Sequence, residues 1–112
     1  MHWIHVTAED QLQKIIVKSQ VKPQVIFKYS SCCQFSEIVF QRLQKNCCPG
    51  EIDFLFLDLT NYSHISEKVS EIFSVSHQSP QILVINEGHC IFHESHPDIS
   101  LEGILQRITV AA

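Results

Sequence analysis

Two adjacent cysteines, Cys32 and Cys33, lie where an apolar segment gives way to a helical pattern. A thiol that follows a strand and precedes a helix lies at the helix N-terminus. There, unpaired backbone N–H groups and the helix dipole stabilise negative charge. The thiolate is the form of cysteine that attacks disulfides, so a lowered thiol pKa makes such a cysteine reactive. The position favours a redox-active cysteine over a structural one.

The residues 33–36 read Cys-Gln-Phe-Ser, a C-x-x-S pattern. Ser36 stands where a dithiol enzyme has its resolving cysteine; its hydroxyl can hydrogen-bond the thiolate but cannot form a disulfide. The pattern predicts a monothiol mechanism in which Cys33 attacks a mixed disulfide between a protein and a small thiol, keeps the small thiol and releases the reduced protein. A second small thiol or a partner reductase then regenerates Cys33. We expect Cys32 to point the other way and be buried, the alternative being a resolving or regulatory thiol.

The elements that must position these cysteines alternate along the chain. Apolar, β-branched and aromatic runs predict strands, and helical spacing with caps and breakers predicts helices. The predicted order is β-α-β-α-β-α-β-β-α, with an N-cap at Thr7 and a closing hairpin around residues 86–88. Such an order requires a mixed sheet of four to five strands flanked by helices. We predict an α/β, thioredoxin-like fold in a single domain over residues 1–112. The predicted strands are 3–6, 24–29, 52–59, 81–85 and 90–92, and the helical patterns follow Thr7, follow Phe35, cover 62–73 and start at Leu101.

A second group of residues, 77–81, reads His-Gln-Ser-Pro-Gln directly before a predicted strand. In thioredoxin folds a proline at this place is commonly cis and faces the redox cysteine, and the residue before it offers backbone hydrogen bonds to a bound thiol. Cis X–Pro bonds are otherwise uncommon, about 5% of such bonds. We predict a cis bond between Ser79 and Pro80. His77 is either a nearby acid–base group or a surface loop histidine.

Composition narrows the function classes. The 112 residues carry a net charge of −4, and their eight Lys and Arg are scattered, which disfavours a nucleic-acid binder. No run approaches the roughly 20 apolar residues that span a bilayer, and the start has no secretory pattern, so we expect a cytoplasmic protein with no membrane partner. Five cysteines cannot all pair within one chain. The adjacent pairs also lack the C-x-x-C spacing of a zinc site.

Three ordered motifs resemble one family over essentially the whole chain. Residues 28–36, Lys-Tyr-Ser-Ser-Cys-Cys-Gln-Phe-Ser, are similar to its Lys-His-Ser-Thr-x-Cys-Pro-Ile-Ser segment. Residues 75–81, Val-Ser-His-Gln-Ser-Pro-Gln, and 95–100, Ser-His-Pro-Asp-Ile-Ser, resemble its other two signatures. The family is the monothiol bacilliredoxins of the general-stress YtxJ type.

The resemblance implies a bacterial, cytosolic thioredoxin-like protein that removes bacillithiol from protein mixed disulfides. It implies no bound cofactor, bacillithiol as co-substrate, and bacillithiolated proteins and a low-molecular-weight thiol or reductase as partners. The active cysteine falls on Cys33, the serine on Ser36 and the cis-proline on Pro80; we expect Ser79, Pro80 and Gln34 to contact the substrate. The sequence departs from the family pattern at Gln34, Cys32 and Pro97. Gln34 replaces a proline, which leaves the redox poise less predictable.

Three alternatives remain open. The fold could serve a catalytically inactive binding or stress-adaptor protein, which a buried Cys33 of ordinary pKa would favour. Cys32, Cys33, His77 and His96 could hold a metal. Cys33 could instead pair with Cys32 or with Cys47 or Cys48, although the latter two lie roughly 20 Å away along the helix.

The motif at residues 95–100 also has a structural interpretation. Ser95 or Asp98 would then cap the final helix, and His96 would pack at the strand end rather than hold the small thiol.

Overall fold

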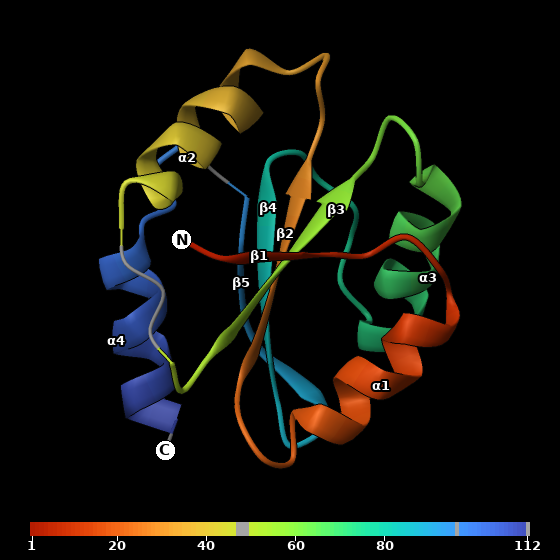
Figure 1. Ribbon diagram of the computed structural model, residues 1–112, viewed down its shortest axis with the longest axis vertical. Coiled ribbons are helices and arrows are strands. Elements are labelled where there is room, and N and C mark those ends of the chain that lie inside the picture. The colour runs from red at the N-terminus through yellow and green to blue at the C-terminus, as the bar shows by residue number, and fades with distance from the viewer. Residues whose placement is uncertain (47–49, 96, 112) are drawn as a thin grey trace.

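The computed structural model describes residues 1–46, 50–95 and 97–111, and in this part of the chain the elements follow the predicted order (Figure 1). Each predicted strand and helix is present, with bounds that differ from the prediction by a few residues. The strands are β1 (Trp3–His5), β2 (Gln24–Tyr29), β3 (Asp53–Asp58), β4 (Gln81–Asn86) and β5 (His89–Glu94). The helices are α1 (Asp10–Lys18), α2 (Gln34–Gln44), α3 (Ser63–Phe73) and α4 (Leu101–Ala111).

The strands form one mixed sheet in the order β1-β3-β2-β4-β5. β1 and β2 run parallel to β3, and β4 runs antiparallel to both β2 and β5. β2 therefore occupies the centre, and the predicted β4–β5 hairpin is confirmed. Among the helices of the described residues, none has the length and apolar character needed to cross a membrane.

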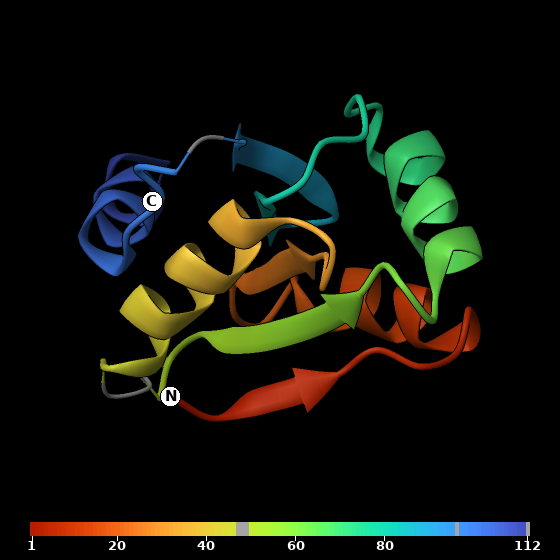
Figure 2. The ribbon, with the colours of Figure 1, turned by 90° about the horizontal axis from the view of Figure 1, so that it is seen from above.

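Side chains alternate across the central strand and build a core on each face of the sheet. Val25 and Phe27 of β2 pack with α2 and α4, whereas Ile26 packs with α1 and α3. Figures 1 and 2 show α2 and α4 on one side of the sheet and α1 and α3 on the other. Helices cover both faces, as the alternating sequence predicts.

Two helices bury most, but not all, of the apolar positions that their spacing predicts. The buried ones are Val39 and Leu43 of α2 and Ile65, Val69 and Phe73 of α3. Phe35 and Ile38 of α2 are 44% and 48% exposed, and Ile72 of α3 is 43% exposed. In α2 the buried polar residue Ser36 takes an interior position that apolar spacing alone does not predict.

The capping predictions are wrong in detail. The first helix begins at Asp10 rather than directly after Thr7. The side chain of Gln11 instead accepts the backbone N–H groups of Thr7 and Ala8, at 2.7 and 2.9 Å. At the start of α4 the hydroxyl of Ser100 accepts the N–H of Gly103 at 3.1 Å, which makes Ser100 an N-cap residue that the sequence analysis did not name.

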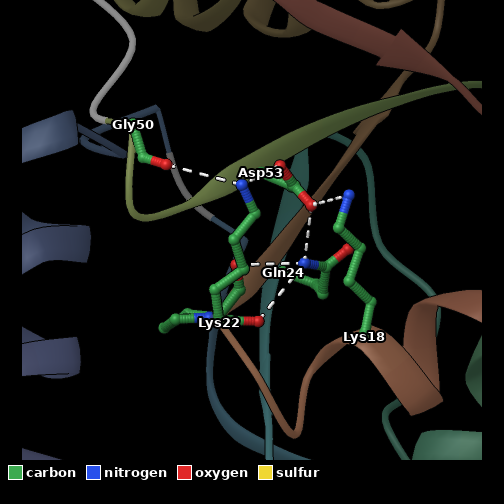
Figure 3. Close-up of polar contacts among 6 residues, drawn as sticks. Lys18, Lys22, Gln24, Gly50 and Asp53 are labelled. Carbon is green, nitrogen blue, oxygen red and sulfur yellow. Dashed lines mark hydrogen bonds and ion pairs between the residues drawn. The ribbon is translucent and has the colours of Figure 1, made fainter.

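An ion-pair cluster lies at the start of β2, at the opposite end of that strand from Cys33. Asp53 accepts hydrogen bonds from Lys18, Lys22 and Gln24, each at 2.9 Å (Figure 3). The contacts tie the end of α1 and the segment that follows it to the start of β3. Burial by itself would raise the pKa of Asp53, but the hydrogen bonds from Gln24, Lys18 and Lys22 outweigh it and hold this pKa below its usual value.

We expect Asp53→Asn to lower the free energy of unfolding by about 1–3 kcal/mol at pH 7, because the amide leaves two lysines without their acceptor charge. The contribution is complete above the unfolded-state pKa of about 3.9 and disappears as pH falls through the lower folded-state value. Urea denaturation at pH 7 and near pH 3 measures both effects. Exposed Glu51→Gln serves as the control, and an equal loss at the two pH values would contradict the ion-pair explanation.

Candidate active site

Antiparallel pairing of β2 with β4 brings the two predicted site segments together. Lys28, near the end of β2, pairs with Gln81 at the start of β4. The loop that follows β2 and the loop that precedes β4 therefore lie at the same edge of the sheet. The Ser79–Pro80 peptide bond is cis, as predicted, and Pro80 is buried.

Cys33 occupies the N-cap of α2 in an extended conformation, with φ −115° and ψ 114°. Its thiol is partly exposed and donates to the carbonyl oxygen of Ser79, with an Sγ–O distance of 3.7 Å. The backbone fixes the turn before it, because the N–H of Cys33 donates to the carbonyl of Ser30 at 3.1 Å. The thiol at the N-terminus of α2 and the residue before the cis-proline are thus in direct contact.

Hydrogen bonds lower the pKa of the Cys33 thiol below its ordinary value. The largest effect comes from the backbone N–H of Ser36, with further contributions from the N–H of Phe35 and the hydroxyl groups of Ser36 and Ser79. Partial burial acts in the opposite direction but does not cancel them. The first turn of α2 thus raises the thiolate fraction near neutral pH, as the sequence argument requires.

Ser36 is fully buried and joins three parts of the site. Its hydroxyl accepts the N–H of Ser30 at 3.2 Å and lies 3.1 Å from the hydroxyl of Ser79. Because the Ser30 N–H already donates to it, the Ser36 hydroxyl has its own proton free for Ser79 or for the Cys33 sulfur. The serine in the C-x-x-S pattern therefore holds the two loops together as well as acting on Cys33.

Cys32 is exposed, so the expectation that it is buried is wrong. Its backbone N–H donates to the hydroxyl of Ser30 at 3.3 Å, and its thiol faces solvent beside Cys33. Gln34, the first residue of α2, is also exposed. A contact between the hydroxyl groups of Ser31 and Thr60, at 2.8 Å, fixes the same loop to the end of β3.

The family model for the monothiol bacilliredoxin BrxC matches residues 4–104. The chain belongs to the monothiol bacilliredoxin family. With the thioredoxin fold, this membership makes it a thiol–disulfide oxidoreductase in the general sense.

Solved structures similar to this bacilliredoxin-family chain share its fold at low sequence identity. A thioredoxin-fold protein with a proposed oxidoreductase activity is 22% identical, with a TM-score of 0.82, over 95% of this chain and 93% of the other. The thioredoxin Mala s 13 of Malassezia sympodialis is 15% identical, with a TM-score of 0.75, over 100% and 92%. The thioredoxin of Fasciola hepatica is 16% identical, with a TM-score of 0.71, over 96% of each chain.

His77 of this family member is an exposed residue of the loop, with Nδ1 of its ring directed at β2 and α3. Its Nδ1 lies 3.0 Å from the hydroxyl of Ser66 and 3.4 Å from the ammonium of Lys28. The suggested metal site would combine it with His96, which lies outside the described residues, as do Cys47 and Cys48. Within the described ranges, no three His, Cys, Asp or Glu side chains form a group that could hold a metal ion.

The third motif packs against α2 and β4. The hydroxyl of Ser95 accepts a hydrogen bond from Gln81 at 3.2 Å, and Arg42 donates to the carbonyl of Ile99 at 2.8 Å and to that of Pro97. These contacts position the start of α4 beside α2. They give the motif a structural role at the described residues, and the suggested role of His96 in holding a small thiol stays a prediction.

Sequence reasoning missed the buried lysine in β2. Lys28 has no exposed surface and lies directly after the apolar run 25–27. Its signal was present in the sequence, since a lysine at an inward position of a central strand is unusual. The sequence does not show that this position is buried, because its burial depends on β3 and β4, which flank β2 in the sheet.

Proposed function

We propose that this protein removes bacillithiol from protein mixed disulfides through Cys33. The observation that carries the proposal is the environment of that thiol: partly exposed, at the N-cap of α2, and with its pKa lowered by the helix and by Ser36. Membership of the monothiol bacilliredoxin family supports bacillithiol as the small thiol.

The reaction has two exchange steps. The Cys33 thiolate attacks the bacillithiol sulfur of a protein–bacillithiol disulfide, forming a Cys33–bacillithiol disulfide and releasing the protein thiolate, which takes up a proton. A second bacillithiol, as its thiolate, then attacks the adduct and leaves as oxidised bacillithiol disulfide, and Cys33 returns as a thiolate. A partner reductase that supplies two electrons would serve the same purpose.

Neighbouring residues have separate tasks in this proposal. The N–H groups of Ser36 and Phe35 stabilise the thiolate before attack and again when the adduct is resolved. Ser79 contacts the sulfur, and it would bind the small thiol together with its neighbour Pro80 and with the exposed Gln34 that follows Cys33. Because Ser36 cannot form a disulfide, an external thiol must attack the Cys33–bacillithiol disulfide to resolve it, unless the exposed thiol of Cys32 does so.

The adaptor alternative has less support than the catalytic one. It requires a buried Cys33 of ordinary or raised pKa, whereas this thiol is partly exposed and its pKa is lowered. Cys90 shows the contrast, since burial raises the pKa of its thiol, which donates to the carbonyl of Phe92 at 3.3 Å. The proposed reaction needs a reducing compartment, and we place it in the cytoplasm of a bacterium that makes bacillithiol.

The test is transfer of the small thiol. A carrier protein with one cysteine is prepared as its mixed disulfide with bacillithiol, with glutathione or with cysteine, and each is mixed with the reduced protein. We expect the bacillithiol form to react fastest and peptide mass spectrometry to place the adduct on Cys33. Free bacillithiol should then remove the adduct.

The other outcomes are distinct. Equal rates with the three carriers would reject bacillithiol as the specific co-substrate while keeping thiol–disulfide exchange. An unmodified Cys33 with all three would favour the adaptor alternative.

A further inference from the structure

Lys28 is a buried cation whose partners carry no negative charge. Its ammonium lies 3.3 Å from the carbonyl of Ser66, 3.1 Å from the hydroxyl of Ser70 and 3.4 Å from Nδ1 of His77. These three acceptors match the three N–H donors of an ammonium group. Burial lowers the pKa of Lys28 to about 8, so the group is mostly charged at neutral pH.

A charge in this place opposes folding. Hydrogen bonds to neutral groups recover only part of the solvation that an ammonium loses on burial, and a well-packed apolar side chain is often the more stable choice. Packing alone therefore gives no reason for a lysine here. Its three partners lie on α3 and on the loop that follows α3, which leads to Ser79.

His77 is the partner on that loop. An ammonium group can only donate, so Nδ1 of the neutral His77 ring accepts from Lys28 and the ring proton belongs on Nε2; the Ser66 hydroxyl lies 3.0 Å from the same nitrogen. Partial burial of the ring is the largest cause of its lowered pKa. Two charged groups also act on it: Lys28 from β2 disfavours a second positive charge and lowers the pKa of His77 further, and Glu67 from α3 has a smaller opposite effect.

The loop over residues 74–80 is anchored at its two ends, where the side chains of Val75 and Pro80 are buried. Near its start, the N–H of Val75 donates to the carbonyl of Ser70 at 3.2 Å, and the side chain of Gln81 holds the carbonyl of Ser76 at 2.9 Å. At its end, Ser79 contacts the sulfur of Cys33 and the hydroxyl of Ser36. His77 lies between these points, and its contacts bind the middle of the loop to β2 and α3.

We propose that Lys28 and His77 are positioning residues that hold the 74–80 loop so that Ser79 stays against Cys33, and that protonation of His77 releases this hold. The inference rests on the proposed function for its biological meaning, because it would make the oxidoreductase sensitive to mild acid. A proton on Nδ1 removes the lone pair that receives Lys28 and sets two positive charges side by side. The hold is complete above the ordinary imidazole pKa of about 6.5 and weakens as pH falls below it.

The decisive measurement follows the backbone amide of Ser79 by NMR between pH 5 and 8 in Cys33→Ser, where no thiol at position 33 titrates. We expect the Ser79 amide shift to move with the same midpoint as the His77 ring. Cys33→Ser/His77→Asn keeps an acceptor near the place of Nδ1 but cannot titrate, so its Ser79 shift should stay constant. Exposed His89→Asn, on β5, is the matched control and should leave the response intact.

A second readout uses the native thiol. Alkylation of Cys33 at pH 7, where His77 is neutral, should be about three- to tenfold slower in His77→Ala, because the Ser79 hydroxyl no longer helps to stabilise the thiolate. His77→Asn should restore the rate to within about twofold of the unchanged protein, a rescue that loss of general stability would not show.

A Ser79 amide that ignores the His77 titration, or that still responds in the His77→Asn variant, would overturn the inference. Neither readout requires bacillithiol or turnover. Failure of the proposed function would therefore appear in the transfer assay alone, and failure of this inference in the pH response alone.

Discussion

Cys33→Ser is expected to lower the rate of small-thiol transfer by at least about a thousandfold, because a serine hydroxyl is almost never ionised near neutral pH and leaves no nucleophile. The substitution changes one atom of a partly exposed side chain, so the fold should survive. Release of the reduced carrier protein, followed by mass spectrometry, measures the loss. Circular dichroism of the same sample checks that the variant is folded.

Cys32→Ser is the matched control for this prediction. It makes the same atomic change at the neighbouring position, where the thiol is exposed. We expect the first exchange step to keep its rate within about threefold, because the N–H groups that stabilise a thiolate are directed at position 33. If Cys32→Ser loses the first exchange step and Cys33→Ser retains it, the nucleophile is Cys32 and the prediction is wrong.

Lys28→Met is expected to stabilise the protein by about 1–3 kcal/mol at pH 7, because the substitution removes a buried charge and keeps most of the length of an unbranched side chain. The contact between His77 and the Ser66 hydroxyl remains available in this variant. Urea denaturation of the two proteins measures the difference in the free energy of unfolding.

The pH dependence of this difference follows from the lowered pKa. Below about pH 8 both the folded and the unfolded states hold the Lys28 proton, and the unfavourable burial is fully present. Between this value and the unfolded-state pKa of about 10.4, only the unfolded state keeps the proton, so the unchanged protein gains stability as pH rises. The difference in the free energy of unfolding between Lys28→Met and the unchanged protein should therefore become smaller as pH rises from about 8 to about 10.4.

Lys28→Met should also change the pKa of the His77 ring. Without the neighbouring ammonium, the pKa of the His77 ring should rise toward its ordinary value, which an NMR titration detects. Lower stability of Lys28→Met at pH 7 would contradict the view that this charge opposes folding. The lysine would then be a favourable part of the core rather than a residue kept for its effect on the loop.

The sequence predicted most of the fold because the fold depends on short-range patterns. The run 24–29 is apolar and β-branched and became the central strand β2, and the cysteine after it became the N-cap of α2. The cis bond before Pro80 also agrees with the prediction, which depended on knowledge of the thioredoxin-like fold. The order of the strands in the sheet was not predicted, since periodicity alone does not say which strands pair.

Predictions about burial were weaker, because burial depends on residues distant in the sequence. Phe35 and Ile38 have apolar side chains but face outward, while polar Ser36 faces the interior. Cys32 and Cys33 are chemically identical neighbours, and only the turn held by the Ser30 carbonyl and hydroxyl exposes one thiol and places the other beside Ser79.

Two polar clusters were decided by the tertiary structure alone. Asp53 meets Lys18 and Lys22 across more than 30 residues of sequence, and Lys28 meets His77 across 49. A single charged residue gives no local sign of its partner, because ion pairs and buried hydrogen bonds form between segments that only the folded sheet brings together. The sequence by itself determined the elements and the place of Cys33 at the start of a helix. The pairing of β2 with β4 determined what surrounds Cys33, because that pairing places two separate loops at one edge of the sheet.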